Sequence, residues 1–134
     1  MTLKCSYKSI SIAKLSNLDS ENEDSVLVPE ISESSDPIIK FAISDGATES
    51  SFSKEWSNLL VSSYKDKPFD LANLPSTINA ISEAWQSITS VIELPWYARQ
   101  KLENGAFATF LGITLNLEEK TFEAVSIGDC TLFK

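Results

Sequence analysis

The chain has 134 residues, 43% of them hydrophobic, and a formal net charge of −8 at pH 7. This length and composition predict one globular domain, residues 1–134, with a single hydrophobic core. The acidic balance argues against a nucleic-acid partner, because such a surface needs a basic patch. The sequence contains no histidine, which excludes Ser-His-Asp and Cys-His catalysis and histidine zinc sites.

The sequence also favours a cytoplasmic protein without a membrane partner. No stretch reaches the roughly 18 apolar residues of a membrane helix, and the N-terminus lacks the apolar region of a signal peptide. Cys5 and Cys130 lie far apart and match no zinc spacing. We expect both to be buried free thiols inside strands.

The first part of the chain predicts strands separated by acidic loops. Alternating apolar residues indicate strands at Cys5–Ala13 and Ile38–Ser44, although the first pattern changes phase near Lys8. Between them lies a short apolar run, Ser25–Val28, which a proline ends. The stretch Asn17–Asp36 is rich in acid and has no lysine, so it predicts solvated loops that attract cations.

Three helices are predicted next, from apolar residues that share one helical face. They are Phe52–Tyr64, Pro75–Ile92 and Pro95–Leu102. Ser50 or Ser51 is expected to cap the first helix, and Phe69–Leu74 to act as a linker. Asn104 and Gly105 form a typical helix end after the third helix. The apolar face of the second helix comprises Ile78, Ile81, Trp85, Ile88 and Ile92.

After Gly105 the apolar period becomes two, which predicts a β-hairpin. Its strands are Phe107–Leu117 and Thr121–Ile127, and the tail Gly128–Lys134 is also strand-like. Strands, then helices, then strands predict an α+β fold in which the helices pack on one face of an antiparallel sheet. An unpaired sheet edge would allow a homodimer.

The strand Ile38–Ser44 leads directly into Asp45 and Gly46. A carboxylate at the end of a rigid strand, followed by an unobstructed glycine carbonyl, provides two oxygen ligands for a hard cation such as Mg²⁺ or Mn²⁺. The alternative is a plain turn, because Asp-Gly is a common turn former.

Four short motifs occur in a fixed order along the chain. They are Asn22-Glu23-Asp24-Ser25, Asp45-Gly46, Gly105-Ala106-Phe107-Ala108-Thr109 and Gly128-Asp129-Cys130. In this order, and between these predicted elements, they resemble the N-terminal half of the type 2C Ser/Thr protein phosphatases, and are most similar to the divergent bacterial-type branch.

The resemblance implies an antiparallel β-sandwich flanked by helices, in α-β-β-α layers. It also implies that Asp45 bridges two Mn²⁺ or Mg²⁺ ions and that the Gly46 carbonyl ligates one of them. Glu23 and Asp24 would hold metal-bound waters, and Asp129 would be an accessory carboxylate near the ions. The implied activity is hydrolysis of phosphomonoesters on phosphoproteins by a metal-activated water in bacterial signalling.

The chain departs from that family's pattern in several places. The second glycine of the Asp-Gly motif is absent, no arginine precedes Glu23, and Cys130 replaces a serine. The later Asp-Gly and Asp-Asn motifs are also absent, so we expect little activity from these residues alone. Two alternatives are a non-catalytic interaction module that binds a protein partner and an acidic decoy for a basic protein.

Overall fold

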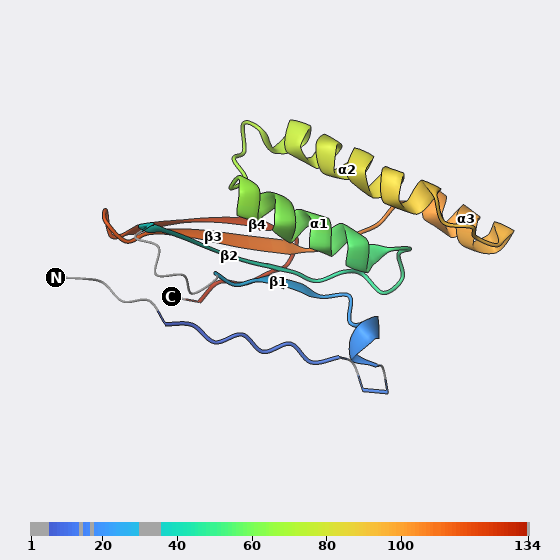
Figure 1. Ribbon diagram of the computed structural model, residues 1–134, viewed down its shortest axis with the longest axis horizontal. Helices are drawn as coiled ribbons and strands as arrows, with labels where there is room; N and C mark the ends of the chain where they lie inside the picture. Colours follow the sequence, from blue (N-terminus) through green and yellow to red (C-terminus); the bar gives the residue numbers. More distant parts are fainter. Residues whose placement is uncertain (1–5, 14, 17, 30–35, 134) are drawn as a thin grey trace.

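The computed structural model describes residues 6–13, 15–16, 18–29 and 36–133. Its strands form one antiparallel sheet in the order β1-β2-β3-β4, and its three α-helices lie on one side of that sheet (Figure 1). This arrangement confirms the predicted α+β fold. In chain order the elements are η1 (Asp19–Glu21), β1 (Ser25–Leu27), β2 (Ile38–Ser44), α1 (Ser53–Asp66), α2 (Leu74–Ser90), α3 (Trp96–Glu103), β3 (Phe110–Asn116) and β4 (Thr121–Ile127).

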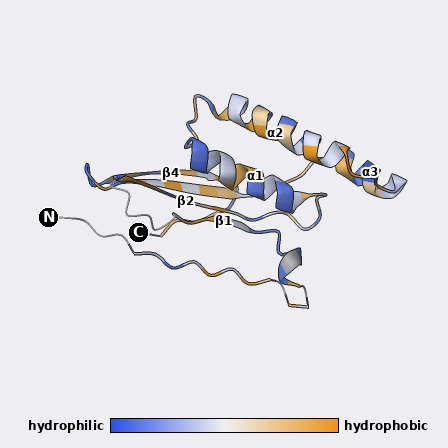
Figure 2. Ribbon diagram, in the orientation of Figure 1, coloured by the Kyte–Doolittle hydropathy of each residue, from blue (hydrophilic) through white to orange (hydrophobic). Residues whose placement is uncertain are grey.

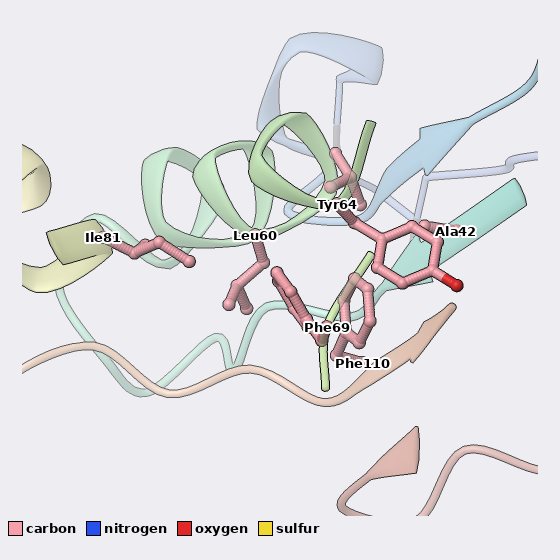
Figure 3. Packing of buried hydrophobic residues seen from close by; sticks show 7 residues of the cluster. Ala42, Leu60, Tyr64, Phe69, Ile81 and Phe110 are labelled. Atoms are coloured by element: carbon pink, nitrogen blue, oxygen red, sulfur yellow. The ribbon is translucent and has the colours of Figure 1, made fainter. Parts of the chain in front are cut away.

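The core lies between α1 and the sheet. Phe110 of β3 is completely buried, and its ring packs against Tyr64 of α1 and Phe69, with centroids 5.4 and 4.7 Å away (Figure 3). Gly112 provides the space for Tyr64, because a Cβ at this glycine would lie 2.6 Å from two ring atoms of the tyrosine. Phe69 was predicted to lie in a linker, but the loop places it in the core.

The face of the sheet that points away from the helices is apolar. Along the register, Ala42 pairs with Gly112 on the helix face, and Ile43 pairs with Leu111 on the opposite face. Figure 2 shows apolar residues along the strands. The outer face includes Ile39, Phe41, Ile43, Leu111, Ile113 and Leu115, as well as Val26. A groove of about 280 Å³ lies on this face.

The two longer helices follow their predicted apolar faces in part. Leu60 and Tyr64 of α1 are buried, as are Ile81 and Trp85 of α2. Ile88 and Ile92, which the same pattern placed on the buried face of the second helix, are 41% and 39% exposed. Ile92 follows the last helical residue, because α2 ends at Ser90. Periodicity identified the face but not how far along the helix it is covered.

The structure contradicts the predicted start of the first helix and confirms the predicted end of the third. Neither Ser50 nor Ser51 caps α1, because its N-cap is Phe52, a left-handed residue with φ of 55° and no side-chain capping bond. The Phe52 carbonyl instead accepts a hydrogen bond of 3.1 Å from Trp85 Nε1. The end of α3 is as predicted, since Asn104 is its C-cap and Gly105 adopts φ of 79°.

The first predicted strand, Cys5–Ala13, is wrong over its described part. Residues 6–13 have no strand pairing, and Cys5 lies outside the described residues. The Tyr7 ring packs edge-on against Phe41 with a centroid distance of 5.6 Å. The segment therefore crosses the outer face of the sheet, where no backbone groups are available to extend the ladder (Figure 1).

The strand-like tail is also an incorrect prediction. Gly128 adopts φ of 87° and turns the chain, so β4 ends at Ile127, and residues 128–133 form no strand. Cys130 is a free, half-buried thiol outside the sheet rather than a buried strand residue. None of the helices in the described ranges is long and apolar enough to cross a membrane.

Replacing Tyr64 with phenylalanine is expected to cost about 1 kcal/mol of unfolding free energy at pH 7, because the Tyr64 hydroxyl shares a 2.8 Å hydrogen bond with Thr114 Oγ1. Burial raises the pKa of Tyr64; the Thr114 hydrogen bond lowers it and the nearby Glu123 charge raises it. Stability from the neutral phenol is therefore fully present below about pH 10 and lost as the pH rises through the folded-state pKa.

Urea unfolding of both proteins between pH 7 and pH 11 checks this expectation. The wild type should lose more stability than Tyr64→Phe across the alkaline range. Parallel pH profiles would contradict a role for Tyr64 ionisation.

Candidate functional site

Asp45 and Gly46 directly follow β2, at the end of the sheet where α1 begins. The Thr109 amide donates to the Asp45 carbonyl at 2.9 Å, and the Ala47 amide donates to the Phe107 carbonyl at 2.9 Å. These two bonds form an isolated bridge between Gly46 and Ala108. The structure thus joins the Asp-Gly motif to the Gly-Ala-Phe-Ala-Thr motif.

The Asp45 side chain is exposed, whereas Gly46 is buried. Both bonds of the bridge use groups of Asp45 and Ala47, so the Gly46 carbonyl does not take part in it. The Asp45 carboxylate is therefore open to solvent, and the bridge leaves the Gly46 carbonyl unused.

Glu23 lies against Gly46. A Cβ at Gly46 would lie 2.8 Å from the Glu23 carbonyl oxygen, 3.1 Å from the Glu23 Cβ and 3.0 Å from the Ser53 carbonyl oxygen. Only glycine avoids these contacts, two of which are with main-chain atoms. The close approach brings the Asn-Glu-Asp-Ser motif next to the Asp-Gly motif.

The start of α1 holds Glu23 in this place. Ser53 Oγ donates to Glu23 Oε1 at 2.8 Å, and Ser57 Oγ donates to the Glu23 main-chain carbonyl at 2.7 Å. The Ser57 hydroxyl also contacts the Ser25 hydroxyl at 2.9 Å, and Ser25 Oγ donates to Asn58 Oδ1 at 2.7 Å. A hydroxyl network therefore links β1, Glu23 and α1.

The Gly-Asp-Cys motif reaches the same region through Thr109. Cys130 Sγ donates to Thr109 Oγ1 at 3.1 Å, and a Cβ at Gly128 would lie 3.0 Å from Thr109 Cγ2. The Thr109 carbonyl accepts a 2.7 Å bond from Ser44 Oγ. The Thr109 amide also donates to the Asp45 carbonyl. Thr109 therefore links the Gly-Asp-Cys motif to the Asp-Gly motif, and all four sequence motifs are in contact directly or through this one residue.

The three carboxylates expected to hold metal-bound waters or to lie near the ions differ in their exposure to solvent. Glu23 is half-buried and packed against Gly46, whereas Asp24 and Asp129 are exposed. Across the described ranges, no three His, Cys, Asp or Glu side chains form a group that could hold a metal ion. The two direct ligands that the resemblance implies are the Asp45 carboxylate and the Gly46 carbonyl. Both are oxygen donors, the ligand type that Mg²⁺ and Mn²⁺ prefer.

Sequence reasoning missed the serines that position Glu23. Ser53 and Ser57 are 1% and 0% exposed, although serine is usually a surface residue. Their spacing of four places them on the same helical face as Leu60 and Tyr64. The available signal is that both serines continue the apolar stripe of the helix toward its first turn.

Comparisons of this chain with protein-family models, with curated proteins and with solved structures found no match.

Proposed function

We propose that this chain is a type 2C phosphatase-like domain that binds Mn²⁺ or Mg²⁺ at Asp45 and Gly46 and acts on phosphoproteins. The observation that carries the proposal is the convergence of all four motifs at the end of β2. These motifs are separated by up to about a hundred residues. The antiparallel order β1-β2-β3-β4 brings them to the same end of the sheet, because the start of β1, the end of β2, the start of β3 and the end of β4 lie there.

The outer face of the sheet supports the finer fold assignment. Val26 and Ile43 are 39% and 45% exposed on a face that carries almost only apolar side chains. A large apolar sheet face is stable in water only when another layer covers it. A β-sandwich would cover this face with a second sheet.

In the proposed site, Asp45 and Gly46 would contact the cation directly. Glu23, Asp24 and Asp129 would accept hydrogen bonds from the waters around it. A bound divalent cation would supply activation of water and neutralisation of charge on the phosphoryl group. Two direct ligands from the chain leave most coordination positions to water, so we expect weak binding and little hydrolysis from the 134 residues.

Removing the Asp45 carboxylate tests this proposal. Calorimetric titration with Mn²⁺ should detect binding to the wild type that is lost in Asp45→Ala, with hydrolysis of an aryl phosphate followed in parallel. Glu49→Ala is the matched control, because it removes another exposed carboxylate from the same loop between β2 and α1. If both variants weaken binding equally, the attraction is general electrostatics and no site exists at Asp45.

A non-catalytic interaction module is the second candidate. It is favoured by the absence of a three-residue metal group in the described part of the chain and by the exposed apolar face. In that case the protein partner would cover the outer face, or a second copy would pair with a sheet edge. Mn²⁺-independent self-association in analytical ultracentrifugation would favour this candidate.

The cytoplasmic location remains a prediction.

A further inference from the structure

We propose that Ser53 is a positioning residue of the candidate site. Gly46 packs against the main-chain carbonyl and Cβ of Glu23, and the Ser53 hydroxyl fixes the Glu23 carboxylate so that its second oxygen faces the hydration shell of a hard cation. This inference rests on the proposed function, because it concerns the same cation. It assigns a role to a buried serine that none of the four motifs includes.

The helix holds Glu23 at two points. Ser53 binds the carboxylate at 2.8 Å, and Ser57, one turn later on the same face, binds the main-chain carbonyl at 2.7 Å. Both serines are essentially fully buried, at 1% and 0% exposure. The two bonds restrain both the backbone and the side chain of one residue.

Gly46 restrains Glu23 from the other side. The space that a Cβ of Gly46 would need is already taken by the Glu23 carbonyl and Cβ. The Glu23 stem therefore cannot move toward the Asp-Gly turn, and Ser53 keeps its carboxylate from swinging into solvent. A change of rotamer would break the Ser53 bond.

The position of Ser53 in its helix explains why its partner is a carboxylate. Ser53 is the first residue of α1 and has no helical carbonyl one turn earlier, whereas Ser87, inside α2, donates to the Glu83 carbonyl at 2.9 Å. Ser53 instead restrains a long acidic side chain, which loses rotamer freedom on being held. A hydrogen bond to a charged group offsets that loss. Ser53 binds Oε1 of the carboxylate, and we assign Oε2 to the waters around the cation.

The test is Mn²⁺ titration by calorimetry of the full chain and its variants. Ser53→Ala should weaken Mn²⁺ binding about ten-fold, the usual effect of removing a partner that orients a ligand. Ser53→Thr retains a hydroxyl and should recover most of the affinity. Ser87→Ala, which removes an exposed helical hydroxyl, should bind as the wild type does.

A second measurement does not depend on metal. Thermal unfolding without metal of Ser53→Ala, Glu23→Ala and the double variant forms a double-mutant cycle. If the melting temperature of the double variant falls by less than the sum of the two single-variant shifts, the hydrogen bond is supported. If the shift of the double variant equals that sum, the bond is overturned. This double-mutant cycle tests the Ser53–Glu23 bond even if the threonine of Ser53→Thr does not fit the buried site.

The two proposals can fail separately. Wild-type affinity in a folded Ser53→Ala variant overturns the role of Ser53 and leaves the proposed function standing. Absence of Mn²⁺ binding by the wild type overturns the proposed function and the cation role of Ser53 together, irrespective of the result of the cycle.

Discussion

Replacing Phe110 with alanine is expected to lower the free energy of unfolding by about 3–5 kcal/mol, the usual cost of deleting a buried aromatic ring. Phe110 is completely buried and contacts both Tyr64 and Phe69. Its removal would leave a cavity between α1 and the sheet that these two rings cannot fill without leaving their own contacts. Chemical denaturation followed by tryptophan fluorescence measures this loss.

Phe107→Ala is the matched control for this prediction. It removes the same side chain three residues earlier, from a position that is 62% exposed. A change at such a surface site should stay within about 0.5 kcal/mol. If the two variants lost equal stability, burial of Phe110 would not explain its effect, and the packing shown in Figure 3 would be contradicted.

Gly46→Ala should both destabilise the protein, by about 1–3 kcal/mol, and abolish Mn²⁺ binding. The added Cβ would lie 2.8 Å from the Glu23 carbonyl oxygen and 3.0 Å from the Ser53 carbonyl oxygen. Main-chain atoms cannot move aside as flexible side chains do, so the backbone must shift, which is the costly form of overpacking. Thermal unfolding and calorimetric Mn²⁺ titration test both effects.

Gly105→Ala separates this steric effect from the general effect of replacing a glycine. Gly105 adopts φ of 79°, but nothing lies within 4 Å of an added Cβ. It should cost about 1–2 kcal/mol through left-handed backbone strain alone. Normal Mn²⁺ binding by Gly46→Ala would show that the close packing of Gly46 and Glu23 has no role in the site.

Much of the fold could be predicted from local pattern. Ile38–Ser44 and Thr121–Ile127 were identified with their observed bounds, because alternation of apolar residues is a property of the strand itself. The end of α3 at Asn104 and Gly105 was equally local, since it depends on the backbone freedom of one glycine.

The same pattern failed where a strand required a partner. Residues 6–13 alternate as a strand does, but they cross a sheet face instead of pairing at an edge. The residues after Ile127 failed for a related reason, because the turn at Gly128 directs them away from the ladder. Periodicity reports which side chains can share a face, and says nothing about whether backbone groups find partners.

For the candidate site, local pattern predicted the residue types and their order: a carboxylate and a glycine after a strand, with acidic and glycine-containing motifs before and after it. The contacts of Glu23 with Gly46, of Thr109 with Asp45, and of Ser53 with the Glu23 carboxylate arise from tertiary packing. Each of these contacts joins residues more than twenty positions apart. Such distances depend on how α1 and β3 pack against β2, and no local spacing encodes that packing.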